Sequence, residues 1–153
     1  MNEEQHIKRQ LHNKCQEFVT ERLQRIQKRI DDIEASLLSE TKSSAGDKHE
    51  TGRAMLQLER EKSGAQLAQV QALLELLTKV NIDNTTTNVG LGSLVITNQA
   101  NYFIAISAGE IVVDNTTYFA VAANTPIGKL LLGKKVGDEI VFNENAIRIT
   151  QVV

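Results

Sequence analysis

Two carboxylates, Asp47 and Glu50, stand three residues apart in the stretch SSAGDKHETGRA, which interrupts a long run of helix-forming sequence. If a helix has begun by Asp47, both side chains share one face of its first turn. A negative charge there meets the positive end of the helix dipole. Two interpretations remain open: the common decoration of a helix start, or a pair of acids presented for chemistry.

A second candidate is a row of basic side chains in the segment QRIQKR and just before it. The row consists of Arg22, Arg25, Lys28 and Arg29. Such a row is either the solvated face of a coiled coil or a contact for the phosphates of an RNA backbone. Both interpretations remain open at this point.

The sequence gives little support for a zinc site, a catalytic nucleophile or a nucleotide-binding motif. His12 and Cys15 form an H-x-x-C pair without the second pair that a zinc site needs, so the sequence does not predict zinc. Cys15 lies on an apolar stripe, which is typical of a small core residue rather than a nucleophile. Phosphate-binding loops, dinucleotide fingerprints and nucleophile elbows are absent from the sequence.

Helices must position the acids and the basic row. Apolar side chains recur at spacings of four and three, which predicts a narrow coiled-coil seam. The first block is Ile7, Leu11, Cys15, Phe18, Val19, Leu23, Ile26, Ile30, Ile33 and Leu37. The second block has the same spacing but is weaker near the turn, where polar residues take two positions: Leu56, Arg60, Ser63, Leu67, Val70, Leu74 and Leu77. Because a lone striped helix has nothing to bury its stripe against, residues 1–80 are expected to fold back as an antiparallel hairpin.

The tip of this hairpin is predicted near residues 40–52, with Ser43 or Ser44 capping the second helix. At ~1.5 Å of rise per residue, about 35 residues give an arm on the order of 50 Å long. The arm would therefore carry Asp47 and Glu50 at its end.

The rest of the chain has a different composition. Residues 1–80 hold 13 basic and 13 acidic residues, whereas residues 81–153 hold 4 and 6, with five of the six aromatics and the one proline. The segment NIDNTTTN, residues 81–88, is rich in turn formers and is predicted to be a linker. Six short stretches of β-branched and aromatic residues in 89–153 predict strands.

One segment of this second domain predicts a helix. Thr125 is a candidate cap, Pro126 suits the first helical position, and Gly133 ends the apolar run. The lysines that accompany it, Lys129, Lys134 and Lys135, are expected to face solvent or a partner rather than to bind an anion. The predicted fold class is therefore α+β: an N-terminal helical hairpin, then a small antiparallel sheet with one short helix.

Composition narrows the classes of function. The chain has 153 residues and a net charge of −2, which gives no overall attraction to nucleic acid or membrane. No apolar run approaches the length of a membrane span, and the polar N-terminus does not resemble a signal peptide. A single cysteine is typical of a reducing compartment, so we expect a cytoplasmic protein.

Two segments together resemble a known family. TPIGKLLLGKKVGDEI is similar to the signature near the C-terminus of bacterial Gre transcript-cleavage factors, and GDKHE resembles the acidic motif at that family's hairpin tip. The matching positions are Pro126, Gly128, Leu131, Gly133, Lys134, Gly137 and Asp138 in the first segment, and Asp47 and Glu50 in the second. The layout, a helical hairpin followed by an FKBP-like domain, is similar as well.

The resemblance implies a transcription elongation factor that binds bacterial RNA polymerase. Its globular domain would dock at the rim of the secondary channel while the hairpin enters the channel. Asp47 and Glu50 would then help hold a magnesium ion at the polymerase's own active site, in the complex only, so that backtracked RNA is cleaved. The implied docking residues are Pro126, Gly128, Lys129, Gly133, Lys134 and Lys135.

On this view the protein is not an enzyme by itself and has no cofactor of its own. The basic row Arg22, Arg25, Lys28 and Arg29 would lie against the 3′ end of the nascent RNA, without independent sequence-specific DNA binding. After Glu50, however, the family continues with asparagine, a further acid and an aromatic residue, where this chain has Thr51-Gly52-Arg53-Ala54. A regulator that binds in the channel without cleavage is therefore an alternative.

Two alternatives come from other classes. An FKBP-like domain suggests a prolyl isomerase or chaperone, but such sites are lined by several aromatic residues, and this chain has no tryptophan and two tyrosines. A coiled-coil adaptor, whose tip has no chemical role, is the remaining possibility.

Overall fold

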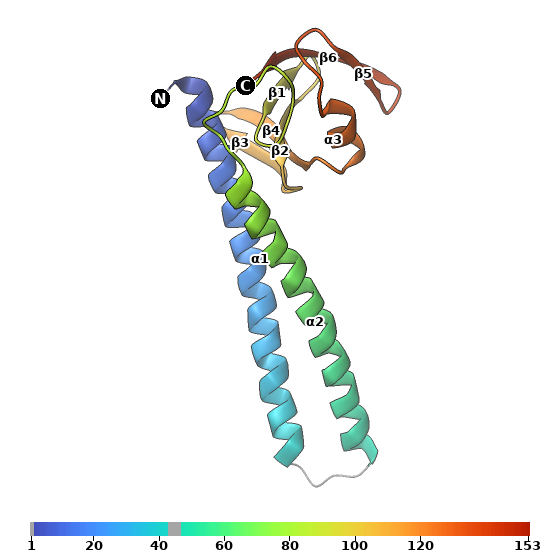
Figure 1. Cartoon of the computed structure of the whole chain (residues 1–153). Coiled ribbons are helices and arrows are strands. Elements are labelled where there is room, and N and C mark those ends of the chain that lie inside the picture. The colour runs from blue at the N-terminus through green and yellow to red at the C-terminus, as the bar shows by residue number, and fades with distance from the viewer. Residues whose placement is uncertain (1, 43–46) are drawn as a thin grey trace. The chain divides into compact units, whose positions relative to one another are not determined.

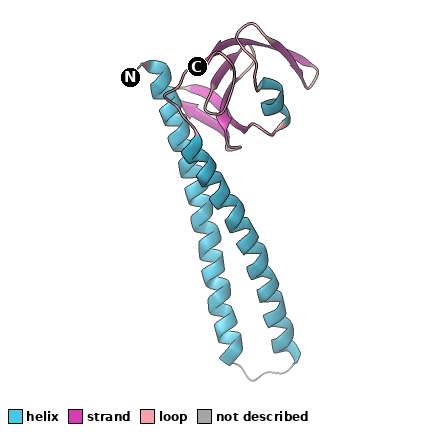
Figure 2. Cartoon of the chain, viewed as in Figure 1, coloured by secondary structure: helices cyan, strands magenta, loops and turns pink. Residues whose placement is uncertain are grey.

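The computed structural model describes residues 2–42 and 47–153, and of residues 41, 42 and 47–49 it describes the backbone only. Helices and strands follow one another as Figure 1 labels them, and Figure 2 separates the helical and strand-rich parts by colour. The helices are α1 (Glu3–Lys42), α2 (Asp47–Lys79) and α3 (Pro126–Leu131). The strands are β1 (Leu94–Thr97), β2 (Asn101–Ala105), β3 (Gly109–Val113), β4 (Thr116–Ala122), β5 (Glu139–Phe142) and β6 (Asn145–Val152).

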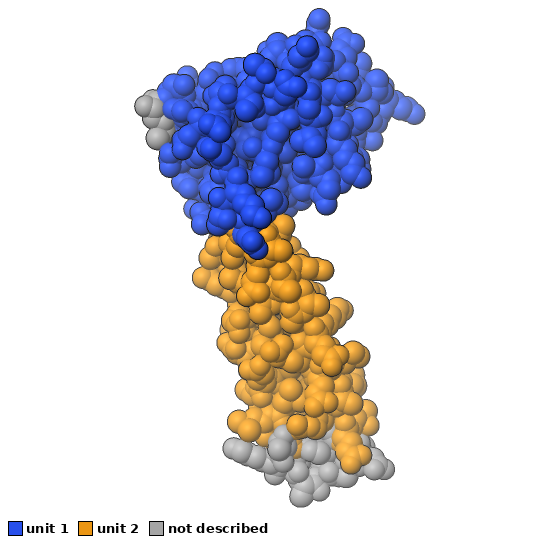
Figure 3. All heavy atoms as spheres, in the orientation of Figure 1, with its two compact units in different colours: residues 1–18, 75–153 blue, residues 19–74 orange. Residues whose placement is uncertain are grey.

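Contacts divide the chain into two compact units, which Figure 3 distinguishes by colour. The sheet unit comprises residues 1–18 and 75–153, and the hairpin unit comprises residues 19–74. The predicted domains 1–80, 81–88 and 89–153 were drawn from composition, whereas these units are drawn from contacts. Both outer ends of the two long helices consequently belong to the sheet unit. Across the residues that are described, no helix combines the length and apolar character needed to cross a membrane.

The hairpin unit packs α1 against α2 along the seam that the spacing predicts. Ile26, Ile30 and Ile33 of α1 and Val70 of α2 are buried. Because these residues recur at spacings of three and four, they form one stripe on each helix, and each helix buries the stripe of the other. Ser63 takes one seam position in α2 and is also buried.

The stripe on α1 continues from Val19 toward the N-terminus of the helix, with one correction to the prediction. Leu11, Cys15 and Val19 are each fully buried at spacings of four. Phe18 was predicted to lie on the same stripe, but its side chain is 37% exposed. The reason is geometric: one residue further along a helix rotates the side chain by about 100°, so Val19 rather than Phe18 points along the stripe.

The sheet is six-stranded in the described residues, in the order β3-β4-β2-β1-β6-β5. Neighbours pair antiparallel except β2 and β4, which are parallel. The prediction of an antiparallel sheet is wrong for this pair. Because β4 turns back from β3 and lies between β3 and β2, β3 becomes the edge strand. The sheet is therefore mixed, and the predicted α+β class is confirmed.

Two short hairpins connect neighbouring strands of the sheet. Asp114 and Asn115 join β3 to β4, and Asn143 and Glu144 join β5 to β6, all four with positive φ. Two successive residues of positive φ suit the right-handed twist of a two-residue hairpin. Asparagine and aspartate tolerate this conformation better than other residues with a side chain.

Helix α3 packs on the sheet with Ile127 and Leu131, and it completes the core of this part of the molecule. The core cluster consists of Val89, Val95, Tyr102, Ile104, Ile127, Leu131, Ile140, Ile147 and Ile149. Burial of these apolar side chains drives the packing, at roughly 25 cal/mol for each Å² removed from water. The short helix is thereby held in a fixed position on the sheet.

Candidate functional site

The signature turn, residues 125–138, starts with the predicted cap. The Thr125 hydroxyl oxygen accepts a hydrogen bond from the Gly128 amide at 3.1 Å and donates one to the Ala122 carbonyl at 2.7 Å. Pro126 follows at the first helical position, where its missing N–H has no consequence. The start of α3 is therefore fixed by local chemistry that the sequence displays.

Gly128 has a steric reason to be glycine. A β-carbon at this position would lie 2.2 Å from the Ala122 carbonyl oxygen and 2.9 Å from the Thr125 hydroxyl oxygen. The first distance is shorter than non-bonded contacts allow, and its partner is backbone. Gly128 thus allows α3 to approach the end of β4, and it is buried rather than presented to a partner.

The end of the signature turn is tied to the rest of the sheet unit by backbone bonds. Gly133 donates to the Val89 carbonyl at 2.8 Å, and Val89 donates to the Lys134 carbonyl at 2.7 Å. Gly133 and Gly137 both have positive φ, where a side chain would be strained. The Lys135 amide donates to the Asp138 carboxylate at 2.9 Å. Most positions that match the family signature therefore serve the backbone of the turn.

Other residues of the signature turn do not shape its backbone but present their side chains to solvent. Leu132 and Val136 are 46% and 57% exposed. Lys129, Lys134 and Lys135 lie beside them in the sequence, are exposed, and form no ion pair with a described residue. Apolar side chains flanked by cations suit a partner surface that is apolar at its centre and acidic at its edge. Of the predicted docking residues, the three lysines, Pro126 and Gly133 are exposed, whereas Gly128 is buried.

The predicted acidic pair lies where α2 begins. Asp47 is the first residue of α2, so the helix has begun there, as sharing a face with Glu50 requires. Glu50 is exposed. The side chain of Asp47 and the candidate caps Ser43 and Ser44 lie outside the described residues.

Arg53, which stands where the resembling family has an acid, has a structural contact. Its guanidinium donates to the Leu37 carbonyl oxygen at 3.3 Å and so links the first turns of α2 to α1. Nearby, Arg60 donates to the Glu34 carboxylate at 3.1 Å across the same pair of helices. Packing does not require glycine at Gly52, since a β-carbon added to it would meet the Glu40 side chain only at an ordinary contact distance of 4.0 Å.

The structure brings together three of the four members of the basic row. Arg22, Arg25 and Arg29 line a hollow of about 230 Å³, together with Ile26 and with Gln66 from α2. Lys28 does not line this hollow, and its ammonium lies 3.5 Å from the Asp32 carboxylate. The three arginines form no ion pair with any residue in the described part of the chain. This hollow is named the arginine hollow.

Lys8 is a feature that sequence reasoning missed. Its side chain is 1% exposed, and its ammonium donates to the carbonyl oxygens of Asn84 at 3.3 Å and Val153 at 3.1 Å. Burial lowers the pKa of Lys8 below its ordinary value, although Asp83 and Glu4 oppose this shift. The sequence could have indicated this burial, because Lys8 lies three residues before Leu11 and therefore on the buried face of the helix.

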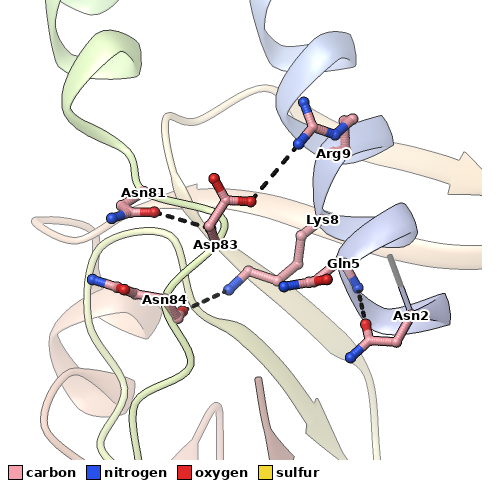
Figure 4. A network of polar contacts seen from close by, with 7 residues as sticks. All are labelled: Asn2, Gln5, Lys8, Arg9, Asn81, Asp83 and Asn84. Carbon is pink, nitrogen blue, oxygen red and sulfur yellow. Dashed lines mark hydrogen bonds and ion pairs between the residues drawn. The ribbon is translucent and has the colours of Figure 1, made fainter.

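Figure 4 shows the polar network around Lys8. Arg9 lies 3.7 Å from the Asp83 carboxylate, and the Asp83 amide donates to the Asn81 side chain at 2.9 Å. These contacts hold the segment after α2 against the start of α1, within the sheet unit. The network therefore explains how residues 81–84 are ordered without secondary structure of their own.

His12 and Cys15 have structural surroundings. The Nε2 of His12 lies 2.9 Å from the Leu77 carbonyl oxygen, which can only accept, so this nitrogen carries the proton. Cys15 is fully buried, and burial raises the pKa of its thiol to about 12. Among the side chains described, no group of three or more His, Cys, Asp or Glu is arranged to hold a metal ion.

Comparison with known proteins adds no relatives. No protein-family model matches the chain, and no curated protein matches it at a significant level of similarity.

Proposed function

We propose that this chain is a Gre-like transcription elongation factor of the cytoplasm that binds in the secondary channel of bacterial RNA polymerase. The observation that carries the proposal is the signature turn with its exposed Lys129, Lys134 and Lys135, in a chain that also contains a long helical hairpin with acids at the start of α2. The sequence resemblance supplies the identity of the partner.

Docking is proposed to use the exposed face of the signature turn. Leu132 and Val136 present apolar area, and the three exposed lysines that neighbour them in the sequence add positive charge. Burial of the apolar side chains would supply affinity, while the lysines would orient an acidic partner surface. Gly128, Gly133 and Gly137 would act indirectly, by giving the turn its shape.

The chemistry is proposed to lie at the start of α2. Asp47 and Glu50 would add carboxylate oxygens to a magnesium ion that the polymerase and the RNA phosphates also hold. The nascent RNA 3′ end is then a neighbour of the arm, with Arg22, Arg25, Lys28 and Arg29 as candidate contacts. The protein itself needs no cofactor for this role, since the metal belongs to the complex.

The test is cleavage of RNA in a backtracked elongation complex from the same organism, with binding measured on the same samples. Asp47→Asn and Glu50→Gln keep the size of each side chain and remove its charge. We expect each to reduce cleavage by about tenfold or more, the scale seen when fixed charge stabilisation is lost, with little effect on binding. Raised magnesium should partly restore the activity.

A docking variant provides the matched comparison. Leu132→Glu in the full chain should weaken binding, because it places a carboxylate within an apolar contact, and Asp47→Asn should not. If the wild-type protein binds but stimulates no cleavage above the polymerase alone, the non-cleaving regulator is correct. If the wild-type protein does not bind polymerase at all, the proposal is wrong.

A further inference from the structure

The arginine hollow is the strongest unexplained feature of the hairpin unit. Arg22, Arg25 and Arg29 bring three permanent positive charges to one depression, and no carboxylate lines it. Ile26 and Gln66 complete the wall. Like charges held close together repel one another, so the site would be stabilised by an anion.

A second hollow, of about 380 Å³, adjoins the first and shares Arg29 and Gln66 with it. Its other lining residues are Met55, Leu58, Glu59, Lys62 and Ser63. Met55 and Leu58 are each 68% exposed, so they offer an apolar surface that the described residues leave largely uncovered. This hollow therefore combines apolar area with polar groups.

Ser63 gives an independent indication that a ligand belongs here. It is 2% exposed, and its hydroxyl makes no hydrogen bond to any residue that the structure describes. A buried hydroxyl without a partner is costly, and such groups are rare in folded proteins. Ser63 also occupies a seam position where a larger apolar residue would fill the space, so the same residue leaves room and supplies a hydrogen-bonding group.

We propose that the two hollows together bind a nucleoside di- or triphosphate. Arg22 and Arg29 are seven residues apart in α1, or ~10 Å along the helix, which suits a chain of phosphoryl groups better than a single phosphate. The nucleoside lies in the second hollow, with its apolar face against Met55 and Leu58 and a polar group at the Ser63 hydroxyl. Glu59 lines the second hollow, and with Asp32 it also lines a neighbouring hollow that shares Arg25 and Arg29, whereas the arginine hollow itself contains no carboxylate.

The test is isothermal titration calorimetry of the full chain at low salt, without divalent cations and without polymerase. The probes are ATP, tripolyphosphate, inorganic phosphate and adenosine. We expect ATP to bind with a stoichiometry of one, tripolyphosphate more weakly, and adenosine and inorganic phosphate at least about tenfold more weakly than ATP, because each lacks one part of the ligand. Because polymerase is absent, failure here is distinct from failure of the proposed function.

Variants sharpen the assignment. Arg25→Gln and Arg29→Gln should each weaken ATP binding about tenfold or more, the effect expected on losing charge-assisted hydrogen bonds. Lys28→Gln removes the same charge three residues from Arg25 but outside the arginine hollow, so it should change the affinity less than about twofold. Circular dichroism on each variant verifies that the helices are intact.

Three results would overturn the proposal. The first is equal loss of affinity in Arg25→Gln, Arg29→Gln and Lys28→Gln, which would mean general electrostatic attraction. The second is no ATP binding by the wild-type chain. The third is binding of a short RNA oligonucleotide, dependent on the three arginines, where ATP does not bind, which would assign the hollow to an RNA backbone.

Discussion

The signature turn and the arginine hollow both present basic side chains, but the fold uses the two regions in different ways. In the signature turn, Gly128 admits a close backbone approach and Asp138 accepts a backbone hydrogen bond. In the arginine hollow, Arg22, Arg25 and Arg29 have no structural partner among the described residues. The first region is specified by the needs of the backbone, whereas the second contains charges that folding does not need.

Residues that shape the backbone and residues without a structural partner therefore support different conclusions about function. A motif whose glycines, proline and aspartate build a turn preserves the shape of that turn, and its exposed lysines must be tested separately as binding groups. Charged and hydroxyl groups without a structural partner, by contrast, contribute nothing to the shape of the fold. Because they reduce or do not increase stability, a ligand is the simplest physical reason for their presence.

The largest expected effect lies in the signature turn. Gly128→Ala would place a β-carbon 2.2 Å from the Ala122 carbonyl oxygen, so either α3 or the end of β4 must move. We expect a loss of about 3–5 kcal/mol in the free energy of unfolding, the range of severe backbone and packing defects. Urea unfolding monitored by circular dichroism measures it.

Gly90→Ala is the matched control for this substitution. A β-carbon at Gly90 would have no neighbour within 4 Å, and its φ is not in the positive region. Its unfolding free energy should change by less than about 1 kcal/mol, and in the stabilising direction if the unfolded chain loses entropy. Equal losses in the two variants would show that the close approach at Gly128 is not what requires glycine.

Sequence reasoning succeeded where the signals are local. The Thr125 cap and Pro126 at the start of α3 are each specified within a few residues. The helical seam was also predictable, because the apolar spacing that favours a helix also determines which face is buried. The α+β class follows from these elements together.

Features that depend on distant segments were not predictable. The parallel pairing of β2 with β4 requires that β4 be inserted between β2 and β3, and nothing in the strands themselves indicates that order. The arginine hollow needs Gln66 of α2 opposite α1, and the burial of Lys8 needs the carbonyl groups of Asn84 and Val153. In each case the sequence shows the residues but not their partners.

A smaller effect is expected from the buried thiol of the sheet unit. Burial raises the pKa of Cys15 from its ordinary 9.0 to about 12, so between these values the unfolded chain loses a proton that the folded chain keeps. A raised pKa adds stability that is fully present below pH 9 and is lost as the pH rises toward 12. We expect Cys15 to account for a loss of roughly 1.5–2 kcal/mol between pH 9 and pH 10.5.

The measurement is the difference in unfolding free energy between wild type and Cys15→Ala across this pH range. The difference is needed because Lys8, whose pKa is lowered, gives a contribution that rises with pH, while Tyr102 and Tyr118, whose pKa values are raised, add to the loss. Val19→Ala, one turn away and equally buried, should keep the wild-type pH dependence. An unchanged slope in Cys15→Ala would mean that the thiol ionises within the folded protein.

The smallest effect tests whether the hairpin unit contains a group that its own folding does not need. Ser63→Ala removes a buried hydroxyl that has no described partner and adds a better helix former. We expect the free energy of unfolding to rise by about 1–2 kcal/mol in the absence of ligand. Ser36→Ala, at an exposed position of α1, supplies the helix-propensity gain alone and should add no more than about 0.5 kcal/mol. A stabilisation of Ser63→Ala greater than that of Ser36→Ala, and weaker binding of ATP by the same variant, would show that this seam serine costs stability and serves a ligand. Equal stabilisation in the two variants would mean that the Ser63 hydroxyl is satisfied in the folded chain, and the contrast between the two regions would then rest on the arginines alone.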